Sequence, residues 1–288
     1  MSPRAIVAKT YKLWIGGRFV RSEGGRVQPF LDPAGLAVAN LARATRKDLR
    51  DAVAAARSAQ PAWGRLGAFH RGQILFRVAE QLEDRRTLFE ERLRAWHGYD
   101  RADAAAEAAC AVDRALWYAG WADKYTQVLG SVNPVAQPFF NFTFPEPTGV
   151  VVILAPRAAP LLGLVSVLMP ALVPGNAVVL AAESLIAVEL AELLATSDVP
   201  GGVVNILTGP REDYAASAAS HMEVDAMACF GGAAAETRAL EEAAAGSVKR
   251  FSLRDDPPPA AWRDPSMQSL YAIEPYVELK TAWHPIGT

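Results

Sequence analysis

The sequence has little of what would assign it to several functional classes. Its 288 residues include two cysteines, Cys110 and Cys229, too few for a disulfide framework or for paired CxxC zinc ligands. Lysine and arginine number 29 against 31 aspartates and glutamates, so no positive excess favours binding to nucleic acid or to an anionic membrane surface. The four histidines are scattered along the chain, and we expect no metal site.

Long hydrophobic runs are also lacking. The longest, Leu161–Leu172, contains Gly163 and Pro170 and is far shorter than the roughly 20 apolar residues that a membrane span needs. The first ten residues show no signal-peptide pattern. With 51% hydrophobic and 21% charged residues the composition is globular, and the low cysteine content favours a cytoplasmic location.

The first 130 residues predict a hairpin followed by three helices. Tyr11–Val20 places two apolar runs around Gly16–Gly17, which is typical of a β-hairpin. Apolar residues at helical spacing predict helices over Lys47–Ala62, Arg71–Trp96 and Asp103–Tyr125.

Between residues 150 and 254, short apolar strands alternate with helices. The expected strands are Val150–Leu154, Ala177–Leu180, Val203–Leu207, Val224–Phe230 and Val248–Leu253. The expected helices are Leu161–Leu172, Val188–Leu194, Glu212–Ser220 and Thr237–Ala245. This alternation predicts an α/β fold with a doubly wound parallel sheet.

Three flanking segments follow other patterns. Val132–Phe144 alternates polar and apolar residues and contains Pro134 and Pro138, which favours an exposed β-ribbon because proline is confined to edge strands and bulges. Asp255–Pro259 is typical of a linker. Tyr276–Trp283 alternates again and predicts one last strand.

These patterns contain no complete catalytic constellation. A nucleotide would bind beyond the carboxyl ends of such a sheet, yet neither GxGxxG nor GxxxxGK[ST] is present. Cys110 lies among alanines in a helix and is expected to pack in the core. Cys229 ends a strand and could react if a helix N-terminus lowered its pKa, but packing is again favoured because no His or Asn is near in sequence.

A series of short motifs resembles the NAD(P)-dependent aldehyde dehydrogenases. In chain order they are LWIGGRFV, AVAAARSAQPAW, WYAGWADKY, EPTGVVVILAP, MPALVPGNAVVL and PGGVVNILTG, within Tyr11 to about Leu253. The resemblance implies an aldehyde-dehydrogenase-like, Rossmann-like sheet with flanking helices and a β-ribbon oligomerisation module. It also implies a chemistry that uses a cysteine nucleophile, an asparagine oxyanion donor, a glutamate base and NAD(P) as hydride acceptor.

The residues at the matching positions depart from that chemistry. The asparagine position is Ala158, which has no donor side chain, and the glutamate position is Arg254, which cannot act as a base near neutral pH. The remaining cofactor candidates lack the family's lysine and serine. They are Pro156, Arg157, Ala181, Gly231 and Gly232. We therefore expect no catalytic residue and at most weak NAD(P) binding.

The family's catalytic domain is absent at the place where the resemblance puts it. Only 22 residues, Arg254–Pro275, precede the tail YVELKTAWHPIG, which is similar to the family's last strand. In the family that strand joins the β-ribbon at a subunit interface. The implied organisation is an NAD-binding-like domain (1–130 and 145–254), an oligomerisation module (131–144 and 270–288) and a linker (255–269). The expected interface residues are Val132, Phe139, Phe140, Phe142, Tyr276, Val277, Leu279 and Trp283.

This combination resembles the shortened second unit of two-unit aldehyde dehydrogenases. The favoured hypothesis is a pseudoenzyme that acts as a structural or regulatory subunit of a complete aldehyde dehydrogenase, because a homo-oligomer would leave the ribbon uncovered. The alternative is a non-catalytic dinucleotide-binding sensor, since helix N-termini favour phosphate without side-chain help. A third hypothesis is that the chain completes the active site or substrate channel of its partner.

Overall fold

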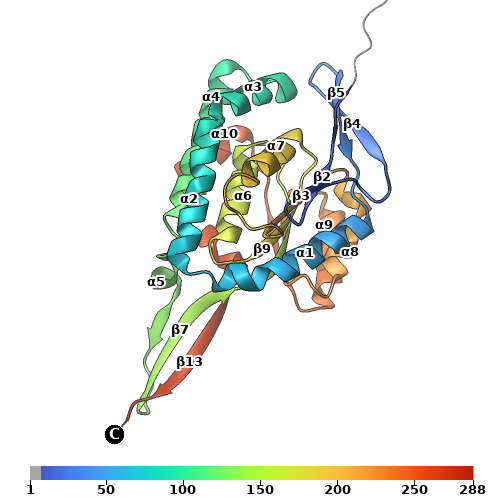
Figure 1. Cartoon of the computed structure of the whole chain (residues 1–288). Helices are drawn as coiled ribbons and strands as arrows, with labels where there is room; N and C mark the ends of the chain where they lie inside the picture. The colour runs from blue at the N-terminus through green and yellow to red at the C-terminus, as the bar shows by residue number, and fades with distance from the viewer. Residues whose placement is uncertain (1–7, 288) are drawn as a thin grey trace, which may run out of the picture.

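A seven-stranded sheet forms the centre of the protein. The computed structural model describes residues 8–287 (Figure 1). The strand order is β12-β11-β8-β9-β10-β2-β3. The bounds are β2 Leu13–Ile15, β3 Arg18–Val20, β8 Val150–Leu154, β9 Ala177–Ala181, β10 Val204–Leu207, β11 Ala226–Phe230 and β12 Arg250–Arg254. Strands β8 to β12 are mutually parallel, which confirms the predicted doubly wound sheet.

Alternate residues of the buried strands face two separate hydrophobic layers. Val151 and Ile153 face a layer covered by α2 (Ala68–Asp84), α3 (Arg86–His97), α4 (Arg101–Ala119), α6 (Leu162–Leu172) and α7 (Leu185–Leu194). Val150 and Val152 face the other layer, which α1 (Arg46–Arg65), α8 (Ala215–Ser220) and α9 (Ala234–Ala245) cover. Because both faces of the sheet are packed, the sequences of these strands are continuous apolar runs.

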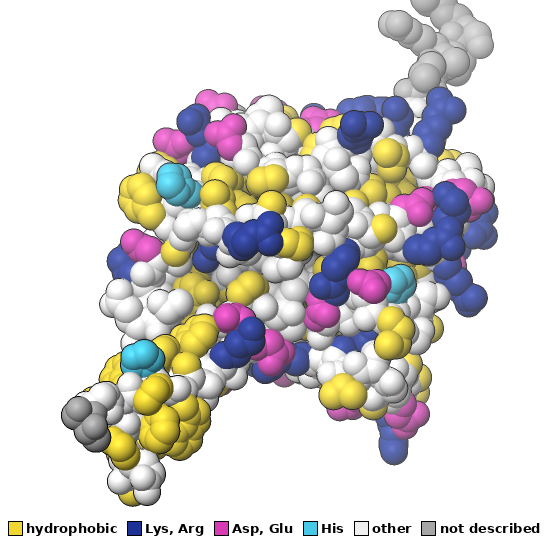
Figure 2. All heavy atoms as spheres, turned by 60° about the horizontal axis from the view of Figure 1, so that its bottom comes forward, with side chains coloured by type: hydrophobic (Ala, Val, Ile, Leu, Met, Phe, Trp, Pro, Cys, Tyr) yellow, Lys and Arg dark blue, Asp and Glu magenta, His cyan; other side chains and the backbone are white. Residues whose placement is uncertain are grey.

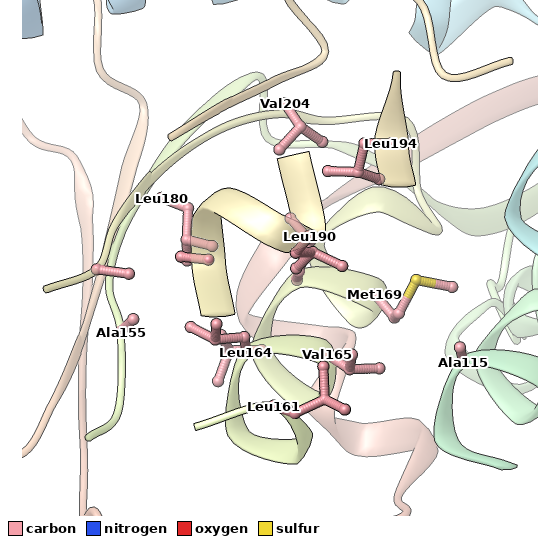
Figure 3. Packing of buried hydrophobic residues seen from close by; sticks show 14 of the residues in the cluster. Ala115, Ala155, Leu161, Leu164, Val165, Met169, Leu180, Leu190, Leu194 and Val204 are labelled. Carbon is pink, nitrogen blue, oxygen red and sulfur yellow. The ribbon is translucent and has the colours of Figure 1, made fainter. Parts of the chain in front are cut away.

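The side chains that α6 and α7 contribute to the first layer are almost all aliphatic. Figure 3 shows Leu180 from β9, Leu190 from α7 and Leu164 from α6 within this one layer. The helices of the α/β half are α6 Leu162–Leu172, α7 Leu185–Leu194, α8 Ala215–Ser220 and α9 Ala234–Ala245, with a 3-10 turn at Arg211–Asp213. The expected helix over 212–220 is thus a 3-10 turn followed by α8. Ser184 begins α7 earlier than expected, because its hydroxyl accepts the N–H of Ile186.

The N-terminal helices differ from the prediction at their ends. They are α1 Arg46–Arg65, α2 Ala68–Asp84, α3 Arg86–His97, α4 Arg101–Ala119 and α5 Tyr125–Leu129. The single helix expected over 71–96 is wrong: Arg85, at φ −99° and ψ 11°, separates α2 from α3. The helix expected over 103–125 ends at Ala119, because the N–H groups of Trp121 and Ala122 bond to the carbonyls of Tyr118 and Ala119, three residues back, instead of four residues back.

The hairpin near the N-terminus is confirmed. Strands β2 and β3 are antiparallel and joined by Gly16 and Gly17, whose φ angles of 62° and 77° are those of a primed turn. A separate three-stranded sheet lies beside it in the order β1-β5-β4. Its strands are β1 Thr10–Tyr11, β4 Val27–Leu31 and β5 Ala37–Ala42.

A three-stranded ribbon projects from the body (Figure 1). It consists of β6 Ser131–Asn133, β7 Phe139–Pro147 and β13 Val277–Pro285, in the order β13-β7-β6. Strand β13 pairs antiparallel with β7 over nine residues of each strand. Pro134 and Pro138 lie in the turn between β6 and β7, outside both strands, where neither needs a ladder N–H.

Residues 255–276 pack against the body, so the segment expected as a linker (255–269) is folded onto it. They form α10 Pro259–Trp262 and three 3-10 turns, Pro265–Met267, Leu270–Ala272 and Glu274–Tyr276. Trp262 and Ile273 are both buried in the main core. The guanidinium of Arg114 on α4 holds this segment, donating from Nη2 to the carbonyl of Trp262 at 3.1 Å and from Nη1 to that of Met267 at 3.2 Å.

Candidate functional site

A cavity of about 320 Å³ lies at the carboxyl ends of the parallel strands. Parallel strands present their last residues and the following loops at one edge of the sheet, where ligands of such folds bind. The lining includes Pro156 and Arg157 after β8, Ala181 at the end of β9 and Arg211 after β10. Strand β4 and His97 close the other side.

The backbone donors after β8 are occupied by a side chain of this chain. Asp256 Oδ2 accepts the peptide N–H of Arg157 at 2.6 Å and that of Ala158 at 3.2 Å. Trp262 Nε1 donates to the other oxygen of the same carboxylate at 3.3 Å. The two N–H groups therefore already have an anionic acceptor.

The turn after β11 is filled in a similar way. Gly232 has φ 120°, and a Cβ there would lie 2.6 Å from Nη2 of Arg211. Arg211 Nη2 donates to Glu236 Oε2 at 3.2 Å, in the first turn of α9. A guanidinium–carboxylate pair thus occupies the space beside Gly232.

The second arginine of the cavity is also paired. Arg157 lies 3.4 Å from Glu183 Oε2, and Gln28 donates to Glu183 Oε1 at 2.6 Å. Ala181 is buried and has no hydrogen-bonding side chain. The cavity therefore has little uncompensated positive charge to attract a pyrophosphate.

These residues do not fit a dinucleotide. Asp256 occupies the N–H groups, the Arg211–Glu236 pair fills the turn, and 320 Å³ is at the lower end of small-molecule sites. Of the five cofactor candidates, Pro156, Arg157 and Ala181 line the cavity, whereas Gly231 and Gly232 adjoin Asp256 and Arg211 respectively.

The structure offers no activated nucleophile at the two cysteines. Cys229 is fully buried, and burial raises the pKa of its thiol, which keeps it protonated. Cys110 is half-buried on α4 beside the main core. Between residues 8 and 287, three or more His, Cys, Asp or Glu side chains nowhere gather as they would around a metal ion.

The two positions that the resemblance associates with catalysis lie at the same edge of the sheet. Ala158 follows β8 and contributes only its backbone, and Arg254 ends β12 with its Nε donating to Ser252 Oγ at 3.3 Å. Neither side chain can accept a proton near neutral pH.

Burial governs the titration of two groups beside this edge. His97 lines the cavity, and desolvation lowers its pKa to about 4. Glu107 on α4 is buried, and its Oε1 accepts the N–H groups of Leu161 and Leu162 at the start of α6, at 2.9 and 3.3 Å. Desolvation nevertheless raises the pKa of Glu107, because burial outweighs those hydrogen bonds.

Seven of the eight expected interface residues lie in the strands of the ribbon. They are Val132, Phe139, Phe140, Phe142, Val277, Leu279 and Trp283. Val277 begins β13 at the root of the ribbon; it and the preceding Tyr276 have 1% and 4% of their surface exposed, so both pack in the core of this chain. Figure 2 shows hydrophobic side chains gathered on the ribbon.

Sequence reasoning missed the groups that occupy the sheet edge. Asp256, Arg211 and Glu236 reach the edge from three different segments, and Asp256 lies 99 positions from Arg157. Spacing along the chain gives no signal for such contacts. Phe144 is missing from the expected interface residues although the sequence could have indicated it, because it continues the alternation of Phe140 and Phe142. Its ring lies 5.9 Å from that of Phe142.

None of the helices between residues 8 and 287 combines the length and the apolar character that a bilayer crossing requires.

Comparison with known proteins gives one consistent result. The profile of the aldehyde dehydrogenase family matches residues 19–254. Retinal dehydrogenase 2 of Mus musculus is 36% identical over 255 residues, which cover 85% of this chain and 48% of the relative. The cytosolic aldehyde dehydrogenase 1 of Elephantulus edwardii is 35% identical over 253 residues, with coverage of 84% and 49%.

Solved structures agree in fold. An NAD+ complex of an aldehyde dehydrogenase from Bacillus cereus superimposes with a TM-score of 0.80 at 27% identity, over 86% of this chain and 51% of that one. PnpE from Pseudomonas sp. WBC-3 gives a TM-score of 0.80 at 31% identity, over 85% and 50%. The chain spans about half the length of the curated relatives it matches.

Proposed function

The chain belongs to the aldehyde dehydrogenase family, and from this premise we propose that it is a pseudoenzyme that assembles, through its ribbon, with a catalytically complete aldehyde dehydrogenase. The observation that carries the proposal is the ribbon of β6, β7 and β13. It projects from the body with large apolar side chains exposed, among them Leu279 at 56% and Trp283 at 59% (Figures 1 and 2).

The ribbon has the properties of a surface that another chain covers. Strand β13 lies at the end of the sheet, so its outer edge has unpaired backbone groups. Phe140, Phe142 and Phe144 form a continuous row, with ring centroids 5.3 and 5.9 Å apart. An edge strand beside an aromatic row supports pairing with a further strand.

The sheet edge supports a role without catalysis. Ala158 and Arg254 provide neither an oxyanion donor side chain nor a base, and the one cysteine at this edge, Cys229, is buried. The alternative of a dinucleotide sensor is disfavoured, since Asp256 and the Arg211–Glu236 pair occupy the groups that a pyrophosphate would need.

Affinity capture from native lysate with a ribbon variant tests the proposal. The double variant Leu279→Asp and Trp283→Asp places charge on the face of the ribbon that carries Phe139, opposite the face of Phe140, Phe142 and Phe144, without touching the core. Phe69→Asp is the matched control, because Phe69 is an equally exposed apolar residue on α2. We expect the wild type and the control to capture a full-length aldehyde dehydrogenase in stoichiometric amounts, and the ribbon variant to capture none. Equal capture by all three, or no aldehyde dehydrogenase with any of them, contradicts the proposal.

A further inference from the structure

A second cavity, of about 350 Å³, lies beside the sheet of β1, β5 and β4, where the chain leaves the β2–β3 hairpin. It shares no lining residue with the cavity at the carboxyl ends of the strands. Its lining includes Lys12 between β1 and β2, Arg21 directly after β3, and Arg26 directly before β4. Small-molecule sites commonly have volumes of roughly 300–1,000 Å³, so the cavity has room for a small ligand.

The charged side chains that line this cavity are all cations. Lys12, Arg21 and Arg26 are exposed, and the lining contains no aspartate or glutamate. Within residues 8–287 none of the three side chains makes an ion pair or a hydrogen bond, whereas Lys9 lies 3.8 Å from the carboxylate of Glu192. Figure 2 shows lysine and arginine side chains gathered at the right of the molecule, the side on which Figure 1 places β4 and β5.

Acidic residues around the cavity compensate only part of this charge. Residues 8–31 contain five lysines and arginines against one acidic residue, Glu23. Behind the lining, the buried carboxylate of Asp48 accepts the hydroxyl of Ser22 at 2.7 Å. Five cations less the charges of Glu23, Asp48 and Glu192 leave an excess of two positive charges. Such an excess favours a dianion over a monoanion.

The backbone that carries the two arginines is held in place by hydrogen bonds within the chain. The N–H of Gly25 closes a turn onto the carbonyl of Ser22 at 3.0 Å. The N–H of Arg43 donates to the carbonyl of Arg26 at 2.9 Å. Arg21 and Arg26 therefore flank a turn that is already formed, and only their side chains lose freedom when they bind an anion.

We propose that this cavity binds the phosphate group of a small phosphorylated compound. A phosphate monoester carries a charge of about −1.5 to −2 at neutral pH and has three strong acceptor oxygens, which guanidinium groups bind in pairs. The phosphate lies among Lys12, Arg21 and Arg26, and the organic part lies against Tyr11 and Val27 of the lining. This site is separate from the ribbon, so the inference does not depend on the proposed assembly.

Calorimetric titration of the full chain at low salt tests the ligand class. The probes share one ring and differ in charge: phenyl phosphate, the monoanion benzenesulfonate and the neutral benzenesulfonamide. We expect phenyl phosphate to bind at least about tenfold more tightly than benzenesulfonate, and the sulfonamide not to bind, because the cavity offers several cations to one anion. Equal binding of the two anions, or no binding of phenyl phosphate at millimolar concentration, overturns the proposal.

Three variants at exposed positions locate the binding within the molecule. Arg21→Gln and Arg26→Gln should each weaken the binding of phenyl phosphate about tenfold, since each removes charge-assisted hydrogen bonds. Arg238→Gln removes the same charge from α9, outside the lining, and should bind like the wild type. Unchanged binding by both lining variants, or equal weakening in all three, would refute the assignment; near-ultraviolet circular dichroism establishes that the variants are folded.

A nucleic-acid backbone is another source of phosphate groups, and a single-stranded oligothymidylate distinguishes it from a small ligand. The chain as a whole has a net charge of −2, which opposes the approach of a long polyanion. We therefore expect the oligonucleotide to bind no more tightly than phenyl phosphate. Tighter binding that both Arg21→Gln and Arg26→Gln weaken would assign this surface to a nucleic acid and overturn the proposal of a small ligand.

Discussion

The carboxylate of Asp256 accepts a hydrogen bond from the peptide N–H of Arg157 at 2.6 Å, and the two residues lie 99 positions apart. The same carboxylate takes the N–H of Ala158 and the indole N–H of Trp262. One side chain therefore connects the end of β8 with the segment that follows β12. It makes there the contacts that a bound anion would make.

Replacing this carboxylate should destabilise the protein. Asp256→Ala leaves the N–H groups of Arg157 and Ala158 without their acceptor, and we expect the free energy of unfolding to fall by about 1–3 kcal/mol. Urea denaturation measures the change. The neighbouring substitution Asp255→Ala removes an exposed carboxylate and should change stability by less than about 0.5 kcal/mol. Equal effects of the two would show that the contact is unimportant.

The packing of segment 255–276 against the body should depend on Arg114. Arg114→Met keeps an apolar stem but leaves the carbonyls of Trp262 and Met267 without a donor, at a cost of about 2 kcal/mol. Hydrogen exchange should show loss of amide protection within 255–276 before the rest of the chain. Arg101→Met, at an exposed position on the same helix, is the control. Unchanged protection of the segment would contradict this account.

Because of His97, the free energy of unfolding should decrease as the pH becomes mildly acidic. Its folded-state pKa of about 4 is below the ordinary value near 6.5, so the unfolded chain binds a proton more readily. The contribution of His97 is therefore complete above pH 6.5 and is lost as the pH falls toward 4, by up to about 3 kcal/mol. His97→Gln should flatten the pH dependence measured by urea denaturation, whereas His70→Gln, at an exposed position, should leave it as in the wild type.

A serine at the turn after β11 should be poorly tolerated. Gly232→Ser introduces a side chain at φ 120°, where its Cβ would lie 2.6 Å from Nη2 of Arg211, and should cost about 2 kcal/mol. Adding Arg211→Ala should recover only part of that loss, since the backbone strain stays. Gly246→Ser has an ordinary helical φ and is the control for thermal denaturation. A neutral Gly232→Ser would show that this turn adapts readily.

Most of the fold could be predicted because its elements are defined locally. Each buried strand is a short apolar run, and several helices begin with a local signal, namely the side chains of Thr45 at α1, Asp100 at α4 and Ser184 at α7. The break at Arg85 could not be predicted, since the apolar spacing continues from Leu82 to Phe89 across it. The proline run after Asp256 indicated a linker. The structure instead packs this segment on the body, because Trp262 is buried in the main core, which composition does not reveal.

The candidate site was only partly predictable for the same reason. The loss of the family's asparagine at Ala158 and of its glutamate at Arg254 can be recognised in the sequence, because each is a single residue within a recognisable motif. What replaced them is visible only in three dimensions, where Asp256 and Arg211 come from distant segments. The burial of Tyr276 and Val277 likewise depends on how the ribbon joins the body.

The pairing of β7 with β13 constrains the order in which the protein folds. Thr143 and Thr281, whose hydroxyls lie 2.8 Å apart in the ribbon, are 138 residues apart in sequence. Closing so long a loop is entropically costly and slow unless the intervening chain has already folded. During synthesis β7 therefore emerges long before its partner strand and has no partner on that side while the α/β body forms. Assembly through the completed ribbon would then follow translation, and a chaperone or the other subunit has that interval in which to shield β7 from aggregation.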